Sequence, residues 1–263
     1  MCRHLAYLGP PVTLADLVLH QPHSLVEQAS APTDMRGVAT INADGFGIGW
    51  LAGDPVGGGV ARRYRRDCPI WSDASLPDLA ASISSGAILA AVRNASEGMP
   101  VTETACAPFV EGPWMFSHNG TIERWPISVA PLADALPPEA LMTMEAPTDS
   151  AFMWALVRQQ LQAGRPGGAV LAEVVADVLA LAPRSRLNLL LHDGLHIVAT
   201  TVGHALWIRH VEGSDDVGSM TVSSEVLDPG ERGWREVPDL SLLEATVGTC
   251  SIRHCDEWDQ GES

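Results

Sequence analysis

The dipeptide Asp193-Gly194 constrains the fold of this chain more than any other feature, because it lies between two strand-like runs. These runs are Leu187–His192 and Leu195–Val202. Asp-Gly is typical of the tightest turns, and a turn this short joins only antiparallel strands. Further strand-like runs occur at 46–51, 60–64, 87–92, 114–118 and 205–210. The pattern therefore predicts antiparallel sheets rather than a doubly wound parallel fold.

Helices are expected at intervals between these strands. In the run Ala169–Ala182, Glu173 and Asp177 share one face at i,i+4 spacing while Val and Leu fill the rest, which is typical of a helix lying on a sheet. Thr148 stands where a helix N-cap is expected, with Asp149 in the first turn. The sequence therefore indicates an α+β protein in which sheets are layered between helices.

Composition excludes several classes of function. The chain has 263 residues, 46% of them hydrophobic, and can bury a sizeable core. Its net charge of −16 argues against nucleic acid, whose phosphates need clustered Lys and Arg. No apolar run approaches the ~20 residues of a membrane helix, and the N-terminus lacks a signal peptide pattern. Five irregularly spaced cysteines are typical of reduced thiols. We expect a cytoplasmic protein, and the sequence leaves open whether it is a homo-oligomer.

Cys2 gains a particular chemistry if the initiator Met1 is removed. The mature chain then begins with one residue that carries both a thiol and a free α-amine. An α-amine titrates near ~7.7, so at neutral pH it can accept the thiol proton and produce the nucleophilic thiolate. Leu5, Tyr7 and Leu8 predict a buried strand that delivers Cys2 to the end of a sheet. We therefore expect Cys2 to be a nucleophile that needs no catalytic histidine.

Three further segments carry polar residues typical of a binding site. Arg93 follows the strand predicted at 87–92, where it could hold a carboxylate through two parallel hydrogen bonds or form an ordinary surface ion pair. Asn119 and Gly120 offer an amide donor and an unobstructed backbone N–H for an oxyanion, although Asn-Gly is also a common tight turn. Asp149 could bind a substrate ammonium or simply cap its helix.

Together, these segments resemble the class II glutamine amidotransferase domain, a family of N-terminal-nucleophile hydrolases whose mature chain begins with Cys. The resemblance runs from Cys2 to about Pro229. It implies a four-layer α/β/β/α sandwich with two antiparallel sheets. We assign residues 2–249 to this domain, with Met1 removed, and residues 250–263, which are rich in acidic side chains, to a flexible C-terminal tail.

The resemblance also implies a role for each candidate residue. Cys2 would attack the γ-carbonyl of a glutamyl group, with its own amine as the base. Arg93 would bind the α-carboxylate and Asp149 the α-ammonium, while Asn119 and Gly120 would hold the oxyanion. We expect neither a cofactor nor a metal. The cluster Cys250, His254 and Cys255 matches no common zinc spacing.

The residues after Arg93 point to the substrate. Amidotransferases that feed synthases typically have Trp-Ala-Thr-His there, whereas this chain has Asn-Ala-Ser-Glu, in which Ser96 keeps a hydroxyl for the substrate. Because no synthase domain follows, we expect hydrolysis of a γ-glutamyl amide, with the released amine as the useful product. The segments MCRHLAYLG and NADGFGIGW are most similar to the ergothioneine-pathway amidohydrolases of this family, which act on γ-glutamyl-hercynylcysteine S-oxide.

Such a small-molecule substrate carries a trimethylammonium group, which favours aromatic faces. Trp71 is our candidate for this contact on the leaving-group side, although core packing is the commoner role of a Trp. Two other functions stay open at this point. The chain could be a glutaminase subunit that delivers ammonia to a separate synthase, or a non-catalytic γ-glutamyl-binding protein. A mere binder, however, has no use for a thiol beside an α-amine.

Overall fold

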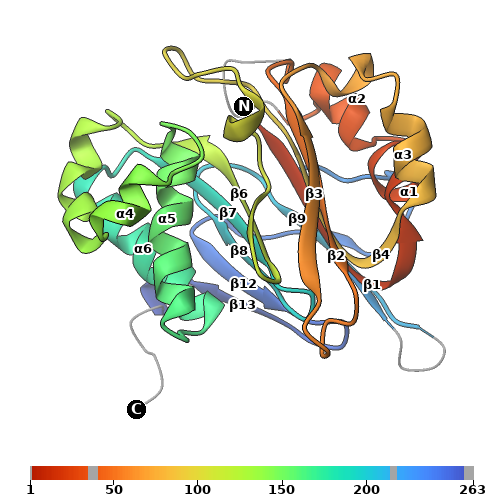
Figure 1. Ribbon diagram of the computed structural model, residues 1–263. Coiled ribbons are helices and arrows are strands. Elements are labelled where there is room, and N and C mark those ends of the chain that lie inside the picture. Colours follow the sequence, from red (N-terminus) through yellow and green to blue (C-terminus); the bar gives the residue numbers. More distant parts are fainter. Residues whose placement is uncertain (1, 35–40, 214–217, 258–263) are drawn as a thin grey trace.

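The computed structural model describes residues 2–34, 41–213 and 218–257, and shows two antiparallel sheets between two layers of helices (Figure 1). Helices α1 to α3 cover the outer face of one sheet, and α5 and α6 cover the outer face of the other. Three hydrophobic cores fill the spaces between the four layers. The predicted α/β/β/α sandwich is confirmed.

The first sheet has seven strands in the order β11-β9-β10-β1-β4-β2-β3, and each neighbouring pair is antiparallel. The strands are β1 (Arg3–Thr13), β2 (Phe46–Ala52), β3 (Val60–Arg66), β4 (Ser84–Val92), β9 (Trp207–Val211), β10 (Ser219–Ser223) and β11 (Trp234–Glu236). The N-terminal strand β1 is therefore the central strand of this sheet. Its first residues lie at one end of the sheet and are buried.

The second sheet has six strands in the order β13-β12-β8-β7-β6-β5. They are β5 (Phe109–Glu111), β6 (Trp114–Thr121), β7 (Arg186–His192), β8 (Ile197–Thr201), β12 (Ser241–Ala245) and β13 (Cys250–His254). The predicted hairpin joins β7 to β8. In its turn, Asp193 Oδ1 accepts hydrogen bonds from the backbone N of Leu195 at 2.8 Å and of His196 at 2.7 Å, and Gly194 has φ +95°.

The described residues also form six α-helices and four 3₁₀ segments. The α-helices are α1 (Leu14–Val18), α2 (Leu25–Ser30), α3 (Leu76–Ser82), α4 (Pro138–Met142), α5 (Asp149–Gln162) and α6 (Gly167–Leu181). The 3₁₀ segments are η1 (Ile70–Ser72), η2 (Glu103–Ala105), η3 (Ile127–Ala135) and η4 (Cys255–Glu257). Helix α6 matches the predicted amphipathic run, and Thr148 caps α5 as predicted, because its Oγ1 accepts from Ala151 N at 3.2 Å.

The side chains of β1 alternate between two cores. Leu5 and Tyr7 pack under α1 to α3, whereas Ala6 and Leu8 lie between the two sheets. His4 shares the inner face with Ala6, and its Nδ1 lies 3.1 Å from Ser117 Oγ on β6 of the other sheet. The beginning of β1 is thus held against β6, which brings the N-terminus close to the second sheet.

One predicted boundary needs correction. We assigned 250–263 to a flexible tail, but Cys250–His254 forms the edge strand β13, and η4 follows it. Pairing with β12, rather than any local pattern of polar residues, places this segment in the sheet. Residues 258–263 lie outside the described residues. Among the helices of the described chain, none is long and apolar enough to cross a membrane.

Candidate active site

Cys2 lies at the end of the first sheet, beside a cavity that both sheets and α5 line. In the pairing of β1 with β4, Arg3 lies opposite Val92, so that Cys2 and Arg93 leave the sheet at the same end. The residues that line the cavity include Cys2, Phe46, Arg93, Cys106, Phe109, Ser117, His118 and Ser150. The fold therefore brings Cys2 and Arg93, which are far apart in the sequence, into one site.

Two thiols line this cavity, and they differ in environment. Cys2 is partly buried, and its Sγ lies 3.8 Å from the carbonyl oxygen of Asn94. Cys106 is fully buried, and burial raises the pKa of its thiol to about 11 despite the nearby charges of Arg93 and Arg65. Cys106 therefore stays protonated at neutral pH, which leaves Cys2 as the candidate nucleophile.

Neither histidine near Cys2 is suited to be its base. Burial, together with the charges of His118, His204 and Arg3, lowers the pKa of His4 to about 3. In His118, Nε2 lies 3.0 Å from the carbonyl oxygen of Arg186 and must carry the hydrogen, while Nδ1 lies 3.1 Å from Ser150 Oγ. This arrangement favours the α-amine of Cys2 as the base. Met1, whose removal would free that amine, lies outside the described residues.

The guanidinium of Arg93 has donors available for a ligand. Its backbone is fixed, because its N donates to Gly45 O at 2.8 Å and its O accepts from Asp44 N at 3.0 Å. In the side chain, Nη1 donates to Pro100 O at 2.8 Å. Within the described residues, no carboxylate forms an ion pair with Arg93. The surface ion pair considered above is thus not what the structure shows, and the remaining N–H groups can bind a carboxylate.

Asn119 and Gly120 lie inside β6, opposite Asn188 and Leu187, and not in a turn. Asn119 is only 1% exposed, and its Oδ1 has no hydrogen-bond partner among the described residues. The unpartnered oxygen could accept a hydrogen bond from a ligand, whereas the predicted oxyanion contact would come from the Nδ2 donor of the same amide. A Cβ at Gly120 would overlap the carbonyl oxygen of Arg186, so only glycine fits this close approach of two strands.

Asp149 begins α5, but it is not the cap of the helix, which is Thr148. Asp149 is buried, with 7% of the residue exposed. Its Oδ2 accepts from Ile122 N at 3.2 Å and its Oδ1 from Ser150 N at 2.8 Å. Asp149 therefore joins the start of α5 to the residue that follows β6, next to the cavity-lining Ser150. An acceptor in this position is compatible with binding an ammonium group.

Of the predicted site residues, only Cys2 and Arg93 line the cavity. Asn119 and Asp149 directly adjoin the lining residues His118 and Ser150 in the chain, whereas Ser96 and Trp71 have no such neighbour. Ser96 is exposed in a turn in which Met99 N donates to Ser96 O at 2.9 Å. Trp71 lies in η1 and is 46% exposed. It follows β3, whose last residue, Arg66, pairs with Phe46 at the same sheet end as the cavity. The substrate contacts of Ser96 and Trp71 stay predictions.

No partner of His118 is evident from the sequence, which favours a structural or surface role for this histidine. The histidine joins β6 to α5 through Ser150 and to β7 through the backbone of Arg186. The one signal in the sequence was the position of His118 directly before Asn119. Neighbouring side chains of a strand point to opposite faces of the sheet, so His118 faces away from Asn119. His118 thus fixes the strand of the oxyanion candidates against the helix that carries Asp149.

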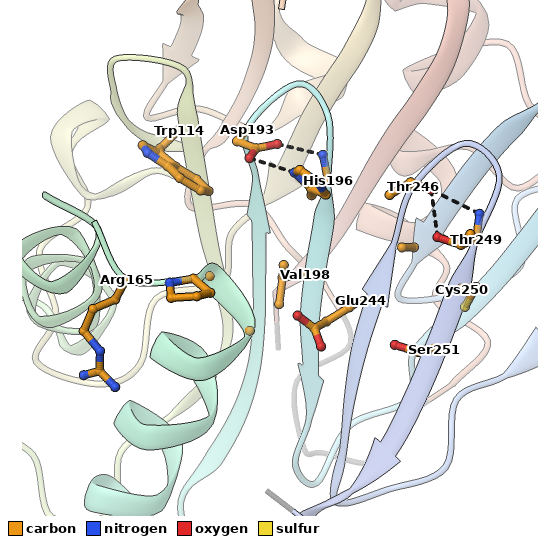
Figure 2. A pocket seen from close by; sticks show the side chains of 14 residues that line it. Trp114, Arg165, Asp193, His196, Val198, Glu244, Thr246, Thr249, Cys250 and Ser251 are labelled. Carbon is orange, nitrogen blue, oxygen red and sulfur yellow. Dashed lines mark hydrogen bonds and ion pairs between the residues drawn. The ribbon is translucent and has the colours of Figure 1, made fainter. Parts of the chain in front are cut away.

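A larger pocket lies elsewhere, between the start of α6, the β7–β8 turn and the β12–β13 hairpin (Figure 2). Its charged groups are paired within the chain: Asp193 lies 3.1 Å from His196, and Glu244 lies 2.6 Å from Arg253. Burial raises the pKa of Cys250 in its lining. This pocket therefore has no activated nucleophile.

Beyond that pocket, the ligand atoms of His254, Cys255 and Asp256 lie within 4.8 Å of one another. Cys250, which the sequence grouped with His254 and Cys255, does not belong to this group. The three residues are consecutive and sit in β13 and η4, on the second sheet's edge farthest from β6. They take no part in the cavity of Cys2.

Comparisons with known proteins agree with this geometry. The family model described as class-II glutamine amidotransferases matches residues 13–212. The chain is 38% identical over 244 residues to the gamma-glutamyl-hercynylcysteine sulfoxide hydrolase of Mycolicibacterium smegmatis, with 93% of this chain and 95% of that protein covered. It is 35% identical over 247 residues to the hydrolase of the same name from Mycobacterium tuberculosis H37Rv, with 94% and 93% covered.

A solved structure shows the same fold. The glutamine aminotransferase class-II domain protein from Silicibacter pomeroyi superposes with a TM-score of 0.63 at 23% identity, and the match covers 96% of this chain and 99% of that one.

Proposed function

The chain belongs to the class II glutamine amidotransferase family, and on this premise we propose that it hydrolyses the γ-glutamyl amide of γ-glutamyl-hercynylcysteine sulfoxide, releasing glutamate. The observation that carries the proposal is the identity of 35–38% over 93–94% of the chain to hydrolases named for this substrate. The cavity supports it, because a thiol without a histidine base lies beside an arginine that no carboxylate of the described residues pairs with.

Acylation begins when the α-amine of Cys2 takes the proton of its own thiol. Sγ attacks the γ-carbonyl carbon, and the carbonyl electron pair moves onto oxygen, where the Asn119 amide and the Gly120 N–H stabilise the negative charge. The oxyanion then collapses and expels the amine of the leaving group, which receives the proton from the α-ammonium. A γ-glutamyl thioester on Cys2 remains.

Deacylation repeats the same steps with water. The α-amine accepts a proton from the attacking water, and a second oxyanion forms at the same donors. Its collapse expels the thiolate of Cys2, which takes back the proton, and glutamate leaves. One residue thus serves as nucleophile and base in both halves, so no cofactor is required.

Arg93 and Asp149 hold the glutamyl head group in this proposal. Arg93 binds the α-carboxylate with the N–H groups that Pro100 O leaves available, and Asp149 binds the α-ammonium. Ser96 and the half-exposed Trp71 are candidates for the leaving-group side, where Trp71 would face the trimethylammonium group. All five cysteines are free thiols, so we place the activity in the reducing cytoplasm.

Arg93→Lys should raise KM for the γ-glutamyl substrate about tenfold with little change in kcat, because a point charge replaces a planar two-pronged donor. Steady-state kinetics of glutamate release measure both constants. A substrate analogue without the α-carboxylate is the control, since the variant and the wild type should then have the same KM. An equal loss with that analogue would show that Arg93 acts on something other than the carboxylate.

The substrate itself is tested by comparing two γ-glutamyl amides. With Met1-processed protein, kcat/KM for γ-glutamyl-hercynylcysteine sulfoxide should exceed that for free glutamine by about tenfold or more, because only the larger amide fills the leaving-group side. Glutamate and the released amine should appear in equal amounts. Faster hydrolysis of glutamine would instead indicate a glutaminase that supplies ammonia, and binding without glutamate release would indicate a γ-glutamyl-binding protein.

A further inference from the structure

Glu225 is a buried carboxylate two residues after the end of β10, and it joins four segments of the chain. Its Oε1 accepts a hydrogen bond from Arg3 Nε at 2.6 Å. Its Oε2 accepts from His23 Nε2 at 2.7 Å, and from Thr33 N and Oγ1 at 2.8 and 2.6 Å. Burial alone would raise its pKa, but the bonds from His23 and Thr33 and the charge of Arg3 outweigh burial and lower the pKa of Glu225 to about 2.

Arg3 carries the effect of this carboxylate to the nucleophile. It is 3% exposed, and its guanidinium donates in three directions. Besides the bond to Glu225, Nη1 donates to the carbonyl oxygen of Cys2 at 3.1 Å and Nη2 to the carbonyl oxygen of Asp34 at 2.5 Å. Because a guanidinium is planar and rigid, fixing Nε on Glu225 also fixes the direction from which Nη1 meets Cys2.

The pair acts from the face of the sheet opposite to the substrate. Arg3, Leu5 and Tyr7 share one face of β1, and Leu5 and Tyr7 pack under the helices α1 to α3. Neither Arg3 nor Glu225 lines the cavity of Cys2. The contact by which the pair reaches the nucleophile is the hydrogen bond from Arg3 Nη1 to the backbone carbonyl of Cys2.

We propose that the ion pair Arg3–Glu225 is a positioning device for the nucleophile: it fixes the carbonyl of Cys2 and thereby aims Sγ at the γ-carbonyl carbon. Chain termini are poorly ordered unless they are tied down. In the mature chain of the proposed function Cys2 is the terminal residue, and the described pairing of β1 with β4 begins only at Arg3. Cys2 lies before the first paired residue of the strand, and the hydrogen bond from Arg3 Nη1 to its carbonyl oxygen holds it in place.

The test uses Arg3→Lys, which keeps the charge paired with Glu225 but lacks the rigid fork that reaches Cys2. Glu225→Asp is the second variant, because it keeps the negative charge and shortens the reach to Arg3 Nε. The matched control is Arg63→Lys, since Arg63 also pairs with a carboxylate, Glu145 at 2.7 Å, and also donates to a backbone carbonyl. The three variants are compared with the wild type at a temperature at which all four proteins are folded to the same extent.

Two reagents separate positioning from general damage. A glutamine analogue with a γ-diazoketone reacts with Sγ only in the correct orientation, whereas iodoacetamide needs only the thiolate, whose base belongs to the same residue. For Arg3→Lys and Glu225→Asp we expect kcat for glutamate release and analogue labelling of Cys2 to fall about tenfold, because small misplacements of reacting atoms are costly. KM and iodoacetamide labelling of Cys2 should stay within about twofold. Arg63→Lys should change none of these.

Each outcome decides the inference. Parallel losses in both labelling reactions, or a loss in Arg63→Lys as large as in Arg3→Lys, would reduce the pair to a structural role and overturn the proposal. The inference rests on Cys2 being the nucleophile of the proposed function, and wild-type protein checks this separately. If the analogue fails to label Cys2 in the wild type, the proposed function falls and the inference with it; if labelling is equal in wild type and variants, only the inference falls.

Discussion

Replacing Cys2 by alanine abolishes glutamate release in this account. The alanine chain still loses Met1 and keeps the α-amine, but no atom remains that can form the thioester. Substrate binding should persist, because Arg93 and Asp149 are untouched, and calorimetry with the intact substrate would measure it. Cys2→Ser should retain only weak turnover, because a hydroxyl is a poorer nucleophile than a thiolate.

A second variant separates the two functions of Cys2. When an added N-terminal residue blocks maturation, the thiol is kept but the α-amine becomes a peptide nitrogen that cannot accept a proton. Turnover should then fall nearly as far as in Cys2→Ala. Full activity in the blocked protein would contradict the amine as base, and full activity in Cys2→Ala would contradict the thioester altogether.

Asn119→Ala should lower kcat about 100-fold or more, a loss of roughly 3 kcal/mol of transition-state stabilisation, because one oxyanion donor is removed. KM should change little, since the amide acts on charge that develops during the reaction. The thermal midpoint should also change little, because the Oδ1 of Asn119 has no partner in the described structure. Steady-state kinetics measures kcat and KM, and thermal unfolding measures the midpoint.

Asn188 is the matched control for this prediction, because it lies directly opposite Asn119 in the neighbouring strand. Its amide is satisfied: Nδ2 donates to His204 O at 3.0 Å, and Oδ1 accepts from Val202 N at 2.9 Å. Asn188→Ala should therefore lower the thermal midpoint of unfolding. The kcat per folded molecule should equal that of the wild type. If Asn119→Ala instead lowered the thermal midpoint and Asn188→Ala lowered kcat, the structural role would belong to Asn119.

Local signals were enough to predict the elements that build the layers. The Asp193-Gly194 turn, the amphipathic run that becomes α6 and the Thr148 cap each depend on neighbours within a few residues. The short strands β5 and β10 to β13 were not predicted, because each is only three to five residues long and has too few residues to show a clear alternation. The polar residues of β13 are typical of a tail, and its pairing with the preceding strand β12 makes it a strand.

The candidate site depends even more on long-range pairing. The register that sets Arg3 opposite Val92 brings Cys2 beside Arg93, and no local pattern specifies that register. Family resemblance, rather than periodicity, supplied the roles of Arg93, Asn119 and Asp149. The contacts of Arg3 with Glu225, 222 positions apart, could not be anticipated, because both residues read as ordinary surface charges until the fold buries them together.

The mass of the protein during turnover tests the central claim most directly. Purified protein is mixed with γ-glutamyl-hercynylcysteine sulfoxide, quenched in acid at short times and analysed intact and after digestion. We expect a chain that lacks Met1 and carries a transient γ-glutamyl group on Cys2, which disappears as glutamate is released. A turning-over protein that retains Met1, or one that carries the glutamyl group on another residue, would contradict it.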